Sequence, residues 1–285
     1  MNNLFLKGTA TGFDYKKSKD DRELQSSLLL SVMNTWLINT YNTQDKLIIE
    51  ISDQQEREYG LIRAALWGFE GDIHNLAVNH HLLTSLLNNR DLSKGLKSLY
   101  TSLLVENFII NLRSIYDFCS VFPRIIMSLK DIQQYKKRKN ADSLNTFINY
   151  CEQESSKDLP NDLRHLMKNA RNEFENIKTI RDLIIHKGKE SIIQIKENET
   201  VFRMPSKPPY GKGNALPDIH DLGNSDYPLM EYLRTLTLTL FEFIEKLGTI
   251  LIMELKNNVN YRLEWTVLVG ICIKDFNNFL YPDKN

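Results

Sequence analysis

Apolar side chains recur every three or four residues through most of this chain, and this spacing restricts its fold more than any other feature. On a helix with 3.6 residues per turn, such residues share one buried face. Residues 160–187 show the pattern most fully, at Leu163, Leu166, Met167, Ala170, Phe174, Ile177, Ile180 and Ile184. Pro160 suits the first turn, Asp158 is a candidate cap before it, and Gly188 is placed to end the helix. The spacing therefore predicts one helix over residues 160–187.

The same spacing predicts further helices along the chain. We expect them at about residues 20–42, 53–69, 72–88, 93–128, 142–153, 227–256 and 259–280. Alternating β-branched residues at 191–195 and 200–204 predict a β-hairpin, and the proline-rich segment 205–225 predicts an irregular loop. Residues 46–51 are expected to form a short strand or an extended link, and residues 129–141 a basic link between helices.

These elements predict an all-α fold, a helical bundle with one small β-hairpin insertion near residues 190–225. Residues 1–90 are expected to form an N-terminal helical extension packed on the same core. Residues 91–257 then form the main helical domain, and residues 258–285 a C-terminal helix or tail. The 285 residues, 42% of them hydrophobic, suffice for a proper core.

A short charged run interrupts the aliphatic end of the 160–187 helix. Arg181 and His186 form an R-x-x-x-x-H pattern, with Asp182 directly after the arginine and Lys187-Gly188 directly after the histidine. At the C-terminal end of an apolar-faced helix, this pattern resembles the signature of the HEPN superfamily (higher eukaryotes and prokaryotes nucleotide-binding). HEPN proteins are all-α domains that include many metal-independent RNases. The resemblance covers about residues 93–256, and it implies a HEPN-like bundle.

The resemblance also implies roles for these residues. His186 would activate the ribose 2′-OH or protonate the leaving oxygen, Arg181 would hold the scissile phosphate, and Asp182 would orient His186. The residue types suit these roles, because the ordinary pKa of histidine, roughly 6.5, permits proton transfer and the planar arginine fork matches phosphate oxygens. Lys187 is a further candidate for substrate binding. The residues alone leave another interpretation open, in which Arg181 and Asp182 are surface charges and His186 caps carbonyls at the helix end.

Helix geometry limits how these side chains can converge. Asp182 and His186 are four residues apart and share a face, whereas Arg181 and His186 diverge by about 140°. One regular helix is therefore not expected to aim both side chains at one phosphate. Either the last turn is distorted or a second copy completes the site, and the resemblance implies a two-fold homodimer that pairs the ends of the two 160–187 helices.

A second polar group lies in the strongly apolar segment 93–128. Arg113 and Asp117 are four residues apart and can form an ion pair on a helix, with Tyr116 between them. A buried ion pair is one interpretation, because charges inside so apolar a helix need partners. The other interpretation makes Arg113, Tyr116 and Asp117 a substrate-binding second wall of the active site. Pro123 is expected to kink or end this helix.

Charge is balanced overall but unevenly distributed. The chain has 36 basic and 36 acidic residues, yet residues 128–213 hold 17 lysines and arginines against 12 acidic residues. The basic excess includes residues 136–139 and surrounds the motif in sequence. A positive field there would suit RNA, although a solvated surface gives the same pattern.

Other sequence features indicate the environment of the protein and the ligands it can bind. Three scattered cysteines without a C-x-x-C pair favour a reducing, cytoplasmic environment. The N-terminal residues do not resemble a signal peptide, and the apolar run 229–255 carries charges such as Glu242 and Glu245, so no membrane span is expected. His74, His80 and His81 have no cysteine or carboxylate partners at ligand spacing, so neither a metal nor a cofactor is expected.

The resemblance thus implies a metal-independent endoribonuclease, similar to stand-alone bacterial HEPN proteins linked to toxin–antitoxin systems or phage defence. Its expected partners are RNA or nucleotide, a second copy of the chain, and an antitoxin or nucleotidyltransferase. The alternative is a non-catalytic HEPN protein that binds RNA, nucleotide or a partner protein. The neutral net charge and the hairpin insertion favour this alternative, whereas the intact R-D-x-x-x-H run favours the enzyme.

Overall fold

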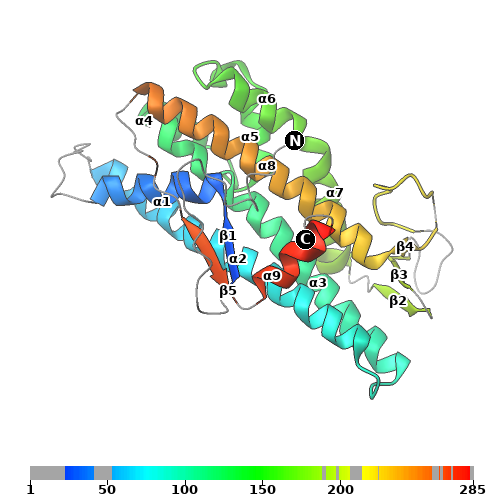
Figure 1. The fold of residues 1–285 in the computed structure, drawn as a ribbon. Helices are drawn as coiled ribbons and strands as arrows, with labels where there is room; N and C mark the ends of the chain where they lie inside the picture. The colour runs from blue at the N-terminus through cyan, green and yellow to red at the C-terminus, as the bar shows by residue number, and fades with distance from the viewer. Residues whose placement is uncertain are drawn as a thin grey trace.

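Helices dominate the structure (Figure 1), a computed structural model that describes residues 23–41, 53–187, 191–196, 199–205, 214–223, 225–258, 263, 266–270 and 272–282. The helices are α1 Leu28–Tyr41, α2 Asp53–Asn88, α3 Lys94–Phe118, α4 Leu129–Lys136, α5 Leu144–Cys151, α6 Asn161–Asn169, α7 Arg171–Lys187, α8 Leu229–Asn258 and α9 Ile273–Leu280, with 3₁₀ turns η1 Phe122–Ile126 and η2 Glu154–Ser156. The all-α class predicted from the apolar spacing is confirmed. None of the helices in these ranges is long and apolar enough to cross a membrane.

Two small antiparallel sheets accompany the helices. β2 (Ile192–Ile195) and β3 (Thr200–Arg203) form the predicted hairpin. A third strand that was not predicted, β4 (Tyr227–Pro228), pairs with β3. β1 (Glu23–Ser26) and β5 (Val267–Gly270) form the second sheet, so residues near opposite ends of the sequence are hydrogen-bonded to each other. The predicted hairpin is therefore confirmed, whereas the pairing of β1 with β5 was not predicted.

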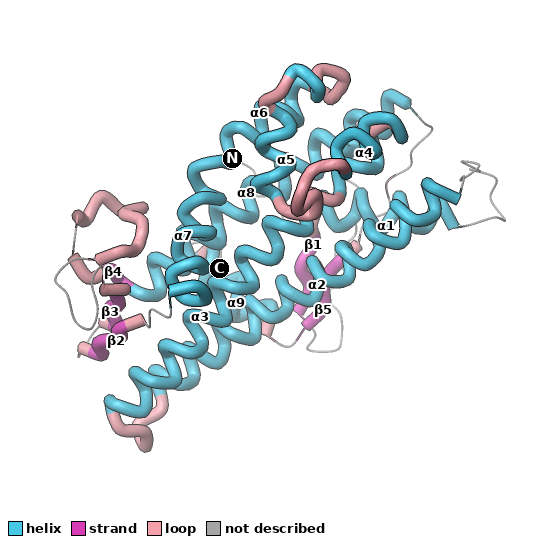
Figure 2. Tube along the Cα trace, turned by 180° about the vertical axis from the view of Figure 1, so that it is seen from behind, coloured by secondary structure: helices cyan, strands magenta, loops and turns pink. Residues whose placement is uncertain are grey.

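α2 and α3 form a long antiparallel hairpin whose tip projects from the rest of the molecule in both views (Figures 1 and 2). Asn107 Nδ2 donates to Asn79 Oδ1 at 3.2 Å and fixes the register of the two helices. Near the other end of the hairpin, a Cβ atom at Gly68 would lie 2.3 Å from the Phe118 ring. Glycine at position 68 therefore lets the two helices approach closely.

α8 forms the other long element and packs against α1. A Cβ atom at Gly248 would lie 2.6 Å from the backbone nitrogen of Leu29, so glycine is needed where the start of α1 crosses α8. One helical turn earlier on α8, Glu245 accepts hydrogen bonds from Ser27 Oγ at 2.8 Å and from the Leu28 backbone N–H at 3.2 Å. The carboxylate of α8 thus caps α1 together with the preceding residue, Ser27, whose Oγ accepts from the Leu30 N–H at 3.4 Å.

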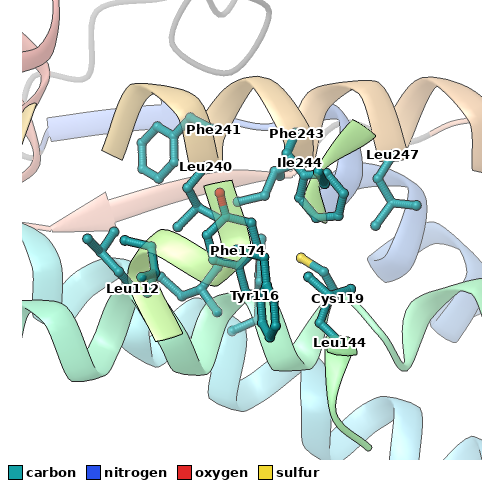
Figure 3. Packing of buried hydrophobic residues seen from close by; sticks show 14 of the residues in the cluster. Leu112, Tyr116, Cys119, Leu144, Phe174, Leu240, Phe241, Phe243, Ile244 and Leu247 are labelled. Atoms are coloured by element: carbon teal, nitrogen blue, oxygen red, sulfur yellow. The ribbon is translucent and has the colours of Figure 1, made fainter. Parts of the chain in front are cut away.

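The core lies between α3, α7 and α8 (Figure 3). Tyr116 packs on Phe174 and Phe243, with ring centroids 6.0 and 5.6 Å apart. Buried residues from the N-terminal helices, the central helices and α9 belong to the same hydrophobic cluster. Segments 1–90, 91–257 and 258–285 therefore share one core where the structure describes them.

Several predicted helix boundaries were wrong. The two helices expected at 53–69 and 72–88 form the single α2, since its internal glycines do not interrupt it. The expected 160–187 helix divides into α6 and α7 at Ala170, and Pro160 is the N-cap of α6 instead of a first-turn residue. Ala170 stays close to helical, because the Phe174 N–H still donates to its carbonyl at 3.0 Å.

Three connecting segments also differ from expectation. The basic segment 129–141 contains α4, because Ser128 caps its N-terminus by accepting from the Asp131 N–H. The segments 20–42 and 259–280 were expected to be entirely helical. Each contains a strand before its helix, β1 before α1 and β5 before α9, and these two strands pair in one sheet. The 93–128 helix ends at Phe118, and Pro123 lies in the first turn of η1, consistent with the predicted break. The element expected at 46–51 lies outside the described residues.

Candidate functional site

The R-x-x-x-x-H residues lie on the last turns of α7, on its outward side. Phe174, Ile177 and Ile180 are almost fully buried and fix the inward face of the helix. The side chains of Arg181 and Asp182 are each 35% exposed. His186 is 63% exposed, so solvent reaches the imidazole directly.

The three side chains meet at one point. Arg181 Nη1 lies 3.0 Å from Asp182 Oδ1 and 3.1 Å from His186 Nε2. Asp182 Oδ1 lies 3.9 Å from His186 Nε2, beyond hydrogen-bond distance. The aspartate therefore holds the arginine more closely than it holds the histidine, in contrast to the expected orientation of His186 by Asp182.

This convergence corrects the expectation from helix geometry. The Cα–Cβ directions of Arg181 and His186 do diverge on a regular helix, but the arginine side chain is long enough to fold back along the helix surface. Because α7 continues as α-helix to Lys187, neither a distorted turn nor a second copy is needed to bring the two side chains together.

The contact pairs a donor with a possible acceptor. A guanidinium group only donates hydrogen bonds, so in a hydrogen bond between the two groups Arg181 donates and His186 Nε2 accepts. A neutral imidazole beside a fixed cation can accept a proton from a hydroxyl group while the cation binds an anionic oxygen.

Arg113 and Asp117 form the i,i+4 ion pair expected of them on α3. The Arg113 guanidinium also lies 4.2 Å above the Phe174 ring of α7. Asp117 Oδ1 accepts from the Leu144 N–H at 2.9 Å and so caps the N-terminus of α5. Both residues therefore connect helices, which supports the buried-ion-pair interpretation over the second-wall interpretation.

Tyr116 is buried and faces a different part of the molecule. Burial raises the pKa of its phenol well above the usual range, so the hydroxyl stays protonated. It lines two adjoining cavities of about 130 and 270 Å³ between α6, α7 and α8, together with Glu173 and Thr239. Arg181, Asp182 and His186 line neither of these two cavities, so the structure does not bring Tyr116 into their site.

Several of the basic residues expected to surround the motif contact other elements. Lys136 pairs with Glu58 of α2, and the Arg164 Nε–H donates to the Cys151 carbonyl at 3.1 Å. Arg171 pairs with Glu152 at 2.8 Å, at the opposite end of α7 from His186. These basic side chains thus join α4, α5 and α6 to their neighbours.

Lys187, expected to bind substrate, is the last residue of α7. Its side chain lies outside the described part of the chain, as do Gly188 and Lys189. Within the described ranges, no group of three or more histidine, cysteine, aspartate or glutamate side chains is arranged to hold a metal ion.

Sequence reasoning missed the roles of several buried ionisable residues, among them Glu245 and His80. Glu245 was noted only as a charge within an apolar run, yet it caps α1. His80 was weighed only as a metal ligand, yet it stacks on Phe279 with ring centroids 4.4 Å apart and holds α9 against α2. The apolar residues around each position were the available signal that these side chains face inward.

No protein-family model, curated protein or solved structure matches this chain.

Proposed function

We propose that this chain is a HEPN-type, metal-independent endoribonuclease whose site consists of Arg181, Asp182 and His186. The observation that supports this most directly is the 3.1 Å contact between Arg181 Nη1 and His186 Nε2 on an exposed helix end. A proton acceptor and a fixed cation thus lie side by side, where an RNA strand has access.

In the proposed reaction, His186 Nε2 takes the proton of a ribose 2′-OH, and the resulting oxyanion attacks the adjacent phosphorus. The bond from phosphorus to the 5′ oxygen breaks, leaving a 2′,3′-cyclic phosphate and a 5′-hydroxyl that takes a proton from the imidazolium or from water. Arg181 turns its N–H groups from His186 to the phosphate oxygens, and Asp182 keeps the guanidinium in place.

The second candidate is a non-catalytic protein of the same class that binds RNA, nucleotide or a partner protein. The openness of the site favours this candidate, because His186 is 63% exposed and an exposed site does not exclude water from reacting groups. Toxin–antitoxin or phage-defence activity, with an antitoxin or nucleotidyltransferase partner, belongs to the proposal through the HEPN resemblance alone.

The deciding experiment incubates the purified chain with mixed RNAs in excess EDTA, beside Arg181→Ala and His186→Ala variants. Each substitution should slow cleavage by about 100-fold or more, and the products should end in cyclic phosphate. Arg171→Ala is a matched control, because Arg171 lies on the same helix with a side chain 32% exposed, compared with 35% for Arg181.

Three other outcomes would change the proposed function or the roles of these residues. Unchanged cleavage by His186→Ala would contradict the assigned roles. Binding of RNA by the wild type without cleavage, weakened by Arg181→Ala, would favour the binding protein. Equal loss of activity in Arg171→Ala would show that general positive charge, and not the Arg181–His186 contact, is responsible.

A further inference from the structure

Exposed apolar side chains concentrate on the α2–α3 hairpin. Of twelve large hydrophobic residues exposed in the described part of the chain, nine lie on these two helices: Leu61, Trp67, Val78, Leu82, Leu96, Leu99, Tyr100, Leu103 and Ile110. The remaining three, Ile185, Leu222 and Met253, are scattered. Large exposed apolar patches are unusual on a monomer, so this concentration on two helices indicates an interaction surface.

Exposed positions recur every seven residues on each helix, and on α2 one of them, Val78, is a large hydrophobic residue. On α3, Leu96, Leu103 and Ile110 are seven apart, and on α2 the exposed positions Ala64, Gly71, Val78 and Ser85 are seven apart. Residues with this spacing form a narrow stripe along one side of a helix. Such a stripe is typical of a seam that packs against another helix.

The two stripes lie on the same side of the hairpin. α2 and α3 are adjacent, held in register by Asn79 and Asn107, and each buries its opposite side in the common core. On α2, Val78 lies about 160° around the helix from His80, which stacks on α9. The stripes therefore form one surface that faces away from α9, which we call the hairpin face.

Between Ala64 and Ser85 on α2 and between Leu96 and Ile110 on α3, the two stripes carry no charged residue, and the next position of the α2 stripe, seven residues before Ala64, is the exposed Arg57. Its exposed members are Ala64, Trp67, Gly71, Asn75, Val78, Leu82 and Ser85 on α2 and Leu96, Leu99, Leu103, Asn107 and Ile110 on α3. This composition contrasts with the whole chain, in which 25% of residues are charged. At one edge the Arg63 guanidinium lies 5.1 Å above the ring of Trp67, whose exposed fraction is 63%.

We propose that the hairpin face binds the hairpin face of a second copy, so that two α2–α3 hairpins form a four-helix interface. In a two-fold contact each surface meets its own copy, and a face without charge avoids the repulsion between like charges that a charged face would suffer. The net charge of zero removes long-range repulsion between copies as well.

The size of the face suits a small dimer interface. At a rise of 1.5 Å per residue, its members span about 32 Å on α2, from Ala64 to Ser85, and about 21 Å on α3, from Leu96 to Ile110. With each helix about 10 Å across, the face covers ~530 Å², or about 1,100 Å² for two copies. A biological interface buries at least about 1,000 Å² in total. Tryptophan is also among the residues that most often dominate binding energy at interfaces, and Trp67 is exposed on this face.

A second copy fits this face better than nucleic acid or an anionic membrane, because both of those need basic residues that the stripes lack. The interface also differs from a pairing of α7 ends, where Ile185 is the one large hydrophobic that the described part of α7 exposes. The inference therefore does not rest on nuclease activity.

Sedimentation of the full chain, over a range of about 1–50 µM, tests the proposal. The wild type should sediment with twice the 33.3 kDa mass of one chain. Leu103→Glu and Val78→Glu should each weaken association by at least ~100-fold, because each buries unpaired charges at the contact. Met253→Glu is the matched control, because Met253 on α8 is 57% exposed and Leu103 is 58% exposed.

Circular dichroism should be the same for all four proteins, because the substituted positions are exposed. A monomeric wild type across the range would overturn the proposal, and so would a Leu103→Glu dimer as tight as the wild type. If Ile185→Glu separates the copies and Leu103→Glu does not, the copies pair through the α7 ends instead. Binding of a monomeric wild type to phosphatidylcholine vesicles would assign the face to a membrane surface and would equally overturn it.

Discussion

Glu245 shows how one buried carboxyl group can make stability depend on pH. Burial raises its pKa to about 7, despite the hydrogen bonds from Ser27 and Leu28. In the unfolded chain the group titrates near 4.5. Between these two values the folded state holds a proton that the unfolded state has lost, so this group makes the protein less stable as pH rises from 4.5 to 7.

We therefore predict that Glu245→Gln removes this dependence. The wild type should lose ~2–3 kcal/mol of unfolding free energy through this one group between pH 4.5 and pH 7, as a raised pKa of this size implies. Urea denaturation at a series of pH values measures the difference between the two proteins. Glu242→Gln, on the same helix with a side chain 50% exposed, should behave as the wild type does.

His80 changes the stability of the protein with pH in the opposite direction. Burial lowers its pKa from 6.5 to about 4, so the folded state keeps the ring neutral while the unfolded state takes up a proton. Its contribution is complete above pH 6.5 and is lost as pH falls through 4. Between pH 4.5 and 6.5 the two groups oppose each other.

This opposition gives a further prediction. The combined contribution of Glu245 and His80 should be nearly flat between pH 4.5 and 6.5, whereas Glu245→Gln should lose stability on acidification through that window. His80→Phe should do the reverse and lose stability as pH rises. If both variants keep the wild-type pH profile, these two residues do not control acid stability.

At the scale of elements, close helix crossings depend on glycine. Gly248→Ala would place a Cβ atom 2.6 Å from the Leu29 backbone, which cannot rotate away as a side chain can. We predict that the free energy of unfolding falls by ~2–3 kcal/mol, because α1 must move away from the Glu245 carboxylate that caps it. Gly60→Ala on α2 meets nothing within 4 Å and should gain up to ~1 kcal/mol from helix propensity. Parallel urea titrations check both, and a harmless Gly248→Ala would contradict the close crossing.

The connection of α3 to α5 gives a test that separates structure from catalysis. Asp117→Ala removes the cap of α5 and leaves Arg113, whose side chain is 13% exposed, without its carboxylate. Stability should fall by ~2–3 kcal/mol. Asp182→Ala should change stability by less than ~0.5 kcal/mol, as expected for a partly exposed surface residue. A stable Asp117→Ala protein that no longer cleaves RNA would support the second-wall interpretation instead.

Most helices could be predicted from the sequence, although α4 was expected to be a link and many helix ends were wrong. The 3.6-residue spacing is a local property of each segment, and it predicted helices where α3, α5, α7 and α8 lie. The predicted helix starts at residues 20 and 259 were wrong, because β1 and β5 pair with each other before α1 and α9 begin. Such pairing between distant residues leaves no trace in a local window.

The candidate site was predictable in its residues and not in its geometry. Arg181, Asp182 and His186 were identified by type and spacing, yet backbone angles alone could not show that the arginine folds back to the imidazole. Arg113 and Asp117 were correctly paired, but the capping of α5 by Asp117 depends on where the 142–153 segment lies in space.

For the molecule as a whole, the pairing of β1 with β5 has a consequence for synthesis on the ribosome. Glu23 lies opposite Gly270, and Glu245 caps a helix that begins at residue 28. The first described strand and helix must therefore wait until nearly all of the remaining chain has emerged. Meanwhile α1 exposes its apolar residues and β1 an unpaired edge, both of which favour aggregation. A nascent chain stalled before residue 267 should bind chaperones far more strongly than the released protein, which pull-down of arrested ribosomes would measure.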